Sequence, residues 1–239
     1  MMSKLLLRGL LAGLFAGMAA LLYAYIYGEP AVASAIDFEG AHAVHDVEEA
    51  EVVSREVQST AGLATAVLAY GVAFGGLFAM AFAFAYGRLG RLDAKATALA
   101  LAWSGYLVVF VVPFLKYPAN PPAVGSPDTI EERTAYYVLM VLASVVLAIA
   151  AVYLGTRLAP RLGTWNSGLI ALAGYVVAIA LVQLVLPAVD EVSDTFPAAL
   201  LWQFRLVTLG TQLVMWTVLG VLFGVLAHRQ LRPRALSTG

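Results

Sequence analysis

Residues 134–156 read TAYYVLMVLASVVLAIAAVYLGT and contain no Asp, Glu, Lys, Arg or His. An α-helix rises about 1.5 Å per residue, so a run of this length crosses the roughly 30 Å of hydrocarbon in a bilayer. The run lacks the alternation of apolar and polar residues that a strand of a membrane barrel shows. A helix satisfies its own backbone polar groups in lipid. The stretch therefore predicts a transmembrane helix.

Five other long runs share this character. Together they predict six transmembrane helices, at about residues 9–27, 61–86, 96–115, 134–156, 164–187 and 206–227. Only 12% of the 239 residues are charged, whereas soluble domains carry roughly a quarter. We expect an all-α polytopic membrane protein, with residues 1–239 forming a single integral membrane domain built as a bundle of six helices.

The charges predict how this bundle lies in the membrane. Lys and Arg concentrate in cytoplasmic segments. With both termini in the cytoplasm, the inner segments contain ten of the fourteen cations, which are Lys4, Arg8, Arg88, Arg91, Lys95, Arg157, Arg161, Arg229, Arg232 and Arg234. Of the fifteen acidic residues, only Asp93 falls inside. We expect cytoplasmic N- and C-termini and a multi-pass location in the inner or plasma membrane. A net charge of −1 leaves no basic stripe for nucleic acid.

The first apolar run has an alternative interpretation as a secretory signal, because Lys4 and Arg8 precede it and residues 31–33, Ala-Val-Ala, resemble a cleavage site. We favour a retained helix, since the run exceeds the apolar core of about 7–15 residues that signals have. It also carries glycines four residues apart, a spacing that allows close helix packing. The glycines with this spacing are Gly9, Gly13 and Gly17, then Gly71 and Gly75, then Gly220 and Gly224.

The outer segment of residues 28–60 is strongly acidic and holds two of the three histidines. If residues from about 35 to 56 were helical, Glu39, His42, Asp46 and Glu49 would share one face, with His45 beside Glu49. Imidazole and carboxylate groups at such spacing bind divalent Co, Ni, Cu or Zn. The candidate metal ligands are Glu39, His42, His45, Asp46 and Glu49. The simpler alternative is a solvated acidic segment with incidental histidines.

The outer loop of residues 116–133 is rich in proline, which fixes φ and removes backbone donors. We expect a rigid, non-helical segment that shapes an entrance. The entrance residues are Lys116, Tyr117, Pro118, Asn120, Pro121 and Pro122. Composition alone favours the plainer interpretation of a helix stop followed by a rigid connector.

The six expected spans contain no ionisable side chain other than tyrosine, and the chain has no cysteine. No buried acid, base or thiol is therefore predicted, and we do not expect an enzyme. Polar residues inside the spans are expected to form hydrogen bonds between helices rather than to line a pathway. They include Thr65, Ser104, Gln183, Thr208, Thr211 and Gln212.

Five segments of the chain are distinctive. They are LLLRGLLAG at 5–13, GEPA at 28–31, VSREVQSTAG at 53–62, FLKYPANPPAVG at 114–125 and FRLVTLGTQ at 204–212. These segments resemble the CbtA family of probable cobalt transporter subunits. The resemblance covers nearly the whole chain and implies cobalt uptake linked to cobalamin synthesis. It also implies a small CbtB-like partner with one membrane helix and a histidine-rich end.

Taken together, these features predict a membrane subunit of an uptake transporter for cobalt or another divalent transition metal. We expect it to capture the ion on its acidic, histidine-bearing outer face. Co²⁺, or Ni²⁺ or Zn²⁺, would be the captured or transported ion, and no tightly bound cofactor is expected. The expected partners are the lipid bilayer and the CbtB-like subunit. Assembly of the chain with copies of itself is a further alternative. The alternative is a non-transporting membrane scaffold or a metal-sensing accessory protein.

Overall fold

The computed structural model describes residues 2–42, 54–88, 90, 92–122, 124–125 and 127–231. Every regular element within these ranges is a helix, which confirms the all-α class. Five of the helices are long and apolar enough to cross a membrane. They are Met2–Ala41, Arg55–Ala85, Ala94–Lys116, Ile130–Val185 and Ala198–Leu231. Many of their apolar side chains are exposed, including Leu184 at 80%. Soluble proteins rarely expose so much apolar surface, so these side chains are suited to contact with lipid.

Three of these spans contain a π-helical turn between two α-helical parts. The first joins α1 (Met2–Tyr23), η1 (Ala24–Gly28) and α2 (Glu29–His42). The second joins α3 (Arg55–Val57), η2 (Gln58–Gly62) and α4 (Leu63–Ala85). The third joins α5 (Ala94–Gly105), η3 (Tyr106–Val111) and α6 (Val112–Lys116). Because each helix continues through its π turn, the first span extends well past the apolar run predicted at residues 9–27.

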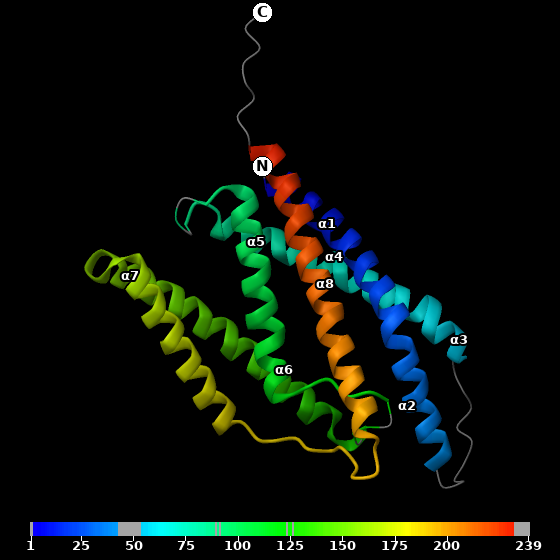
Figure 1. Cartoon of the computed structure of the whole chain (residues 1–239). Coiled ribbons are helices and arrows are strands. Elements are labelled where there is room, and N and C mark those ends of the chain that lie inside the picture. Colours follow the sequence, from blue (N-terminus) through cyan, green and yellow to red (C-terminus); the bar gives the residue numbers. More distant parts are fainter. Residues whose placement is uncertain are drawn as a thin grey trace, which may run out of the picture. The chain divides into compact units, whose positions relative to one another are not determined.

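The prediction of six separate helices is wrong, because the part of the chain that is described has five candidate spans. The predicted helices at 134–156 and 164–187 both belong to α7 (Ile130–Val185), a run of 56 residues. This run is interrupted at Gly163, where φ is 78° and ψ is 161°. Figure 1 shows α7 as two arms that meet at a reversal. The two predicted helices are joined through residues 157–163, Arg-Leu-Ala-Pro-Arg-Leu-Gly, and the chain kinks at Gly163.

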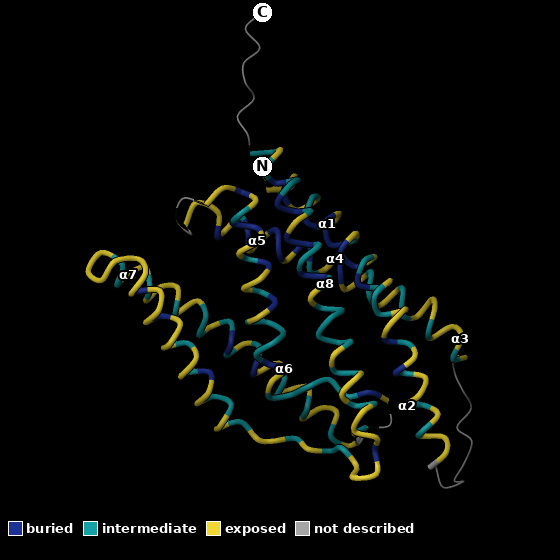
Figure 2. Tube along the Cα trace, in the orientation of Figure 1, coloured by how far each residue is buried: buried dark blue, intermediate teal, exposed yellow. Residues whose placement is uncertain are grey.

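The chain divides into two compact units, Met1–Tyr106 with Trp202–Gly239, and Leu107–Leu201. In the first unit, α1 packs antiparallel to α4 through the predicted glycines. A Cβ atom at Gly75 would lie 2.8 Å from Gly13 Cα and would overlap the Gly9 carbonyl oxygen. Any side chain there would separate the two helices. The buried positions of α1 and α4 in Figure 2 follow this contact.

The same unit contains α8 (Ala198–Leu231), which packs antiparallel to α5. A Cβ atom at Gly220 would lie 2.6 Å from Ala102 Cβ, and one at Gly224 would lie 3.2 Å from Ala98 Cβ. Larger side chains fill the remaining space, with Phe223 against Phe78 and Phe82 at centroid distances of 5.3 and 4.9 Å. The predicted close packing at Gly220 and Gly224 is thus confirmed.

In the second unit, the two arms of α7 lie against each other. The Ser144 hydroxyl is within 2.8 Å of the Tyr175 hydroxyl and donates to the Val108 carbonyl at 2.6 Å. Gln183 Nε2 donates to the Val112 carbonyl at 3.2 Å. These two side chains donate hydrogen bonds to backbone carbonyls in and just after η3, where the π turn disturbs the regular backbone hydrogen bonds of the helix.

The hydrogen-bonding role predicted for polar residues inside the spans is confirmed for Gln183. It is wrong for Thr208 and Thr211, whose hydroxyls donate at 2.9 Å to carbonyls four residues earlier in α8. A threonine on a helix reaches its own preceding turn without help from a neighbouring helix. Sequence position alone does not distinguish these two kinds of partner.

Candidate functional site

The first unit has a basic end, formed where its antiparallel helices bring their basic termini together. Arg8, near the start of α1, donates to the Leu226 carbonyl near the end of α8 at 3.0 Å. The start of α5 contributes Lys95, and the last turn of α8 contributes His228 and Arg229. Acidic residues of α2 and α3 lie at the opposite helix ends. The charge separation predicted from the sequence is therefore present within this unit.

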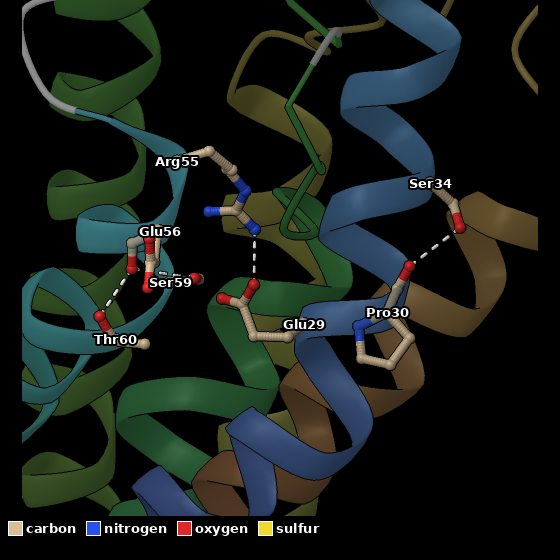
Figure 3. Close-up of polar contacts among 7 residues, drawn as sticks. All are labelled: Glu29, Pro30, Ser34, Arg55, Glu56, Ser59 and Thr60. Atoms are coloured by element: carbon tan, nitrogen blue, oxygen red, sulfur yellow. Dashed lines mark hydrogen bonds and ion pairs between the residues drawn. The ribbon is translucent and has the colours of Figure 1, made fainter.

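An ion pair joins α2 to α3 at the acidic end. Arg55 Nη2 lies 2.5 Å from Glu29 Oε2, and Figure 3 shows the guanidinium directed at that carboxylate. Both side chains are partly exposed, and such pairs contribute about 0–1 kcal/mol. The pair links the helices on either side of residues 43–53. It includes none of the predicted metal-binding residues.

Of the five predicted metal ligands, two lie in α2. Glu39 is exposed, and His42 is the last residue of the helix; its side chain is not described. His45, Asp46 and Glu49 lie outside the described residues. Within the described ranges, no group of three or more His, Asp or Glu residues is placed to hold a metal ion. Glu39 and His42 are three residues apart on one helix, as predicted, but the metal site itself stays a prediction.

The predicted entrance residues lie in the second unit, where Lys116 is the last residue of α6 and the others follow it. The Tyr117 hydroxyl donates to the Pro187 carbonyl at 2.8 Å, and its ring stacks on Tyr136 with centroids 6.4 Å apart. Burial raises the pKa of the Tyr117 hydroxyl, and Tyr136 raises this pKa further, so the hydroxyl keeps its proton at neutral pH. Lys116 Nζ lies 6.0 Å from the centre of the Tyr117 ring.

The remaining entrance residues differ in exposure. Pro121 is buried and its carbonyl accepts from Val124 N at 3.3 Å, whereas Pro122 is exposed. Pro118 and Asn120 are half-buried. The Tyr117 hydrogen bond ties the start of the loop to the segment after α7, and the Pro121–Val124 bond closes a turn within the loop. The expectation of a non-helical segment over residues 116–133 is wrong at its C-terminal end, because Pro127–Thr129 form a 3₁₀ turn and α7 begins at Ile130.

A cavity of about 280 Å³ lies close to this loop in the second unit. Its charged lining consists of Glu132, Arg133, Asp190 and Glu191, and Arg133 Nη1 lies 3.1 Å from Glu191 Oε2. Thr129 also donates to the Glu191 carboxylate. Gly125 approaches this pair so closely that a Cβ atom there would lie 2.8 Å from Glu191 Oε2 and overlap Arg133.

The sequence analysis did not select these cavity residues. Glu132 and Glu191 lie 59 positions apart and meet because α7 reverses at Gly163. The sequence did contain a pattern that could have predicted this meeting, because acidic residues lie just before the apolar run that starts at residue 134 and again just after Pro187. Antiparallel helices would bring those two positions together.

The two acidic regions offer carboxylate groups that are accessible to water. Such groups raise the local concentration of cations through their field. The described carboxylates of both regions are therefore suited to attracting a cation.

A family model described as "Probable cobalt transporter subunit (CbtA)" covers residues 2–228. No curated protein and no solved structure matches the chain.

Proposed function

The chain belongs to the CbtA family of probable cobalt transporter subunits, and from this premise we propose that it captures divalent cobalt on its acidic face and passes it into the cell. The observation that carries the proposal is the charge separation within the first unit. Acidic helix ends lie opposite basic ones, and basic ends face the cytoplasm in membrane proteins. The acidic end then faces outwards, with both termini in the cytoplasm and the protein in the inner or plasma membrane.

The proposed capture residues are Glu39, His42, His45, Asp46 and Glu49. Their mixture of imidazole and carboxylate suits Co²⁺, and also Ni²⁺ and Zn²⁺, better than Ca²⁺ or Mg²⁺. Glu39 is accessible on α2, and the Glu29–Arg55 ion pair joins the first residue of α2 to the first residue of α3. A site that must release its ion is best served by moderate affinity.

We also propose that the proline-rich loop shapes the entrance, with Lys116, Tyr117, Pro118, Asn120, Pro121 and Pro122 as its residues. The bond from Tyr117 to Pro187 supports this role, because it ties the start of the loop to the segment after α7. The driving force would come from the membrane potential or from a partner. A potential of 100 mV, inside negative, favours entry of a divalent ion by about 4.6 kcal/mol.

Uptake of radioactive cobalt by cells that express the chain tests the capture residues. We expect the His42→Ala, His45→Ala double variant to take up cobalt several-fold more slowly at low cobalt concentration. The matched control is Ser34→Ala, Ser54→Ala, which changes two polar side chains of the same outer segment, residues 28–60, but removes no imidazole. Equal uptake by the double-histidine variant and the wild type, at equal amounts in the membrane, would remove these histidines from the mechanism.

Reconstituted vesicles separate transport from a scaffold or sensor role. The chain is incorporated alone, and then with a CbtB-like single-helix subunit, which we propose as its partner. Cobalt flux in either preparation supports a transporter subunit. Absence of flux in both, with the two proteins shown to associate, would favour the scaffold or sensing role.

A further inference from the structure

A second cavity lies at the basic end of the first unit and takes no part in the proposed capture of metal. It has a volume of about 190 Å³ and is lined by Lys95, Val225, His228 and Arg229. Lys95 comes from the start of α5 and the other three residues from the end of α8. Two antiparallel helices therefore direct three basic side chains to one hollow at the end of the helix pair.

These basic groups are not neutralised by nearby acids. Within the described residues, no carboxylate forms an ion pair with Lys95, His228 or Arg229. Asp93, the acidic residue closest in sequence to Lys95, accepts a hydrogen bond at 2.8 Å from Ala96 N and caps α5. The hollow is therefore electropositive.

Backbone electrostatics also bear on the ligand. The N-terminal end of α5 carries partial positive charge and attracts an anion. The C-terminal end of α8 carries partial negative charge, but His228 and Arg229 stand in that last turn and oppose it. A compact anion with several acceptor oxygens satisfies convergent ammonium, imidazole and guanidinium donors best, and phosphate has this chemistry.

The surface beside the hollow is apolar. Leu99 lies one turn along α5 from Lys95, and Val221 lies one turn along α8 from Val225. Leu99 is 37% exposed and Val221 is 45% exposed. A phosphate in the hollow would thus have exposed apolar side chains next to it on both helices. Basic pockets between membrane helices on the cytoplasmic side are a known setting for anionic lipid headgroups.

We propose that the hollow formed by Lys95, Val225, His228 and Arg229 binds a phosphate group, as carried by the headgroup of an anionic phospholipid or by free inorganic phosphate. Binding would hold the start of α5 against the end of α8. The site is independent of the metal-capture proposal, because none of its residues is shared.

The test measures lipid binding to the purified full chain in detergent, by native mass spectrometry, with phosphatidylglycerol and phosphatidylcholine of matched acyl chains. We expect phosphatidylglycerol to bind at least tenfold more tightly. Each Lys or Arg near a membrane surface contributes about 1 kcal/mol to anionic-lipid binding. The Lys95→Gln, Arg229→Gln double variant should therefore bind roughly thirtyfold more weakly.

Two control variants separate charge from folding. Arg88→Gln removes a cation at the end of α4 that donates to the Phe84 carbonyl at 2.6 Å and does not line the hollow, so it should leave binding unchanged. Lys95→Arg, Arg229→Lys keeps both charges and should also retain binding. Unchanged binding in the Gln double variant, equal loss in Arg88→Gln, or equal affinity for phosphatidylcholine would overturn the proposal.

Inorganic phosphate distinguishes the two sources of the ligand. If millimolar phosphate binds to the wild type but not to the Gln double variant, and displaces phosphatidylglycerol, free phosphate is the ligand. If phosphatidylglycerol remains bound in its presence, the ligand is the lipid headgroup. If neither phosphate nor phosphatidylglycerol distinguishes the wild type from the Gln double variant, the site does not exist.

Discussion

Gly75 shows how one residue determines the distance between two helices. Its backbone lies against Gly9 and Gly13 of α1, where a Cβ atom has no room. In lipid there is little hydrophobic force to drive helices together, so close contact of backbones supplies much of the association energy. The absence of a side chain at Gly75 is therefore a structural requirement of the α1–α4 pair.

We predict that Gly75→Ala destabilises the protein by about 1–3 kcal/mol, because the added methyl group forces α4 away from α1. The control is Gly174→Ala in α7, where nothing lies within 4 Å of the added Cβ and helix propensity favours alanine. Thermal unfolding in detergent, followed by size-exclusion chromatography, gives the comparison. Equal unfolding temperatures for the two variants would contradict the packing argument.

Ser144 is a second residue with a decisive contact, since its buried hydroxyl meets both Val108 and Tyr175. Hydrogen bonds between membrane helices contribute about 0.6 kcal/mol on average and up to about 1.7 kcal/mol. Ser144→Ala should lower the free energy of unfolding by an amount in this range. Ser104→Ala, at an exposed position of α5, should have no effect. Unfolding in denaturant measures both, and an equal effect of the two changes would argue against the assigned bonds.

At the scale of the element, α7 shows why a helix cannot be counted from hydropathy alone. Both arms are apolar, and the chain reverses at Gly163, which adopts a backbone conformation essentially restricted to glycine. Arg157 and Arg161 precede the reversal. The arms are tied by the Ser144–Tyr175 contact, and Arg133 near the start of α7 pairs with Glu191 in the segment that follows α7.

Gly163→Ala should therefore destabilise α7 by about 1–3 kcal/mol, the usual energetic cost of such a strained conformation for a residue with a side chain. No neighbour lies within 4 Å of the added Cβ, so the effect would come from the backbone and not from a clash. Gly168→Ala, helical and equally open, is the control and should be neutral or stabilising. A neutral Gly163→Ala would show that the reversal tolerates ordinary residues. Thermal unfolding of the purified variants provides the measurement.

For the whole molecule, the charge asymmetry predicts the orientation of each unit separately. The chain has no cysteine, so a single introduced cysteine is the only thiol of the chain that a labelling reagent can modify. Gly40→Cys and Asp194→Cys should react with a membrane-impermeant maleimide on intact cells. Ser3→Cys and Thr164→Cys should react only after the membrane is opened. Each unit carries one position of each kind, so a reversed result in either pair would refute the proposed orientation of that unit.

The amino-acid sequence by itself determined the helical class, the membrane-spanning runs, the separation of charge and the glycines that bring helices together. These are local properties, since hydropathy and spacing along one helix depend on neighbouring residues in the chain. Only the tertiary structure decided that the helical arms at residues 134–156 and 164–187 meet directly at a kink at Gly163 within α7. It alone also showed that Gly75 meets Gly13, and that the basic hollow forms from Lys95, His228 and Arg229. Such contacts depend on which distant surfaces fit together, and this complementarity of shape and charge cannot be read from a single apolar run.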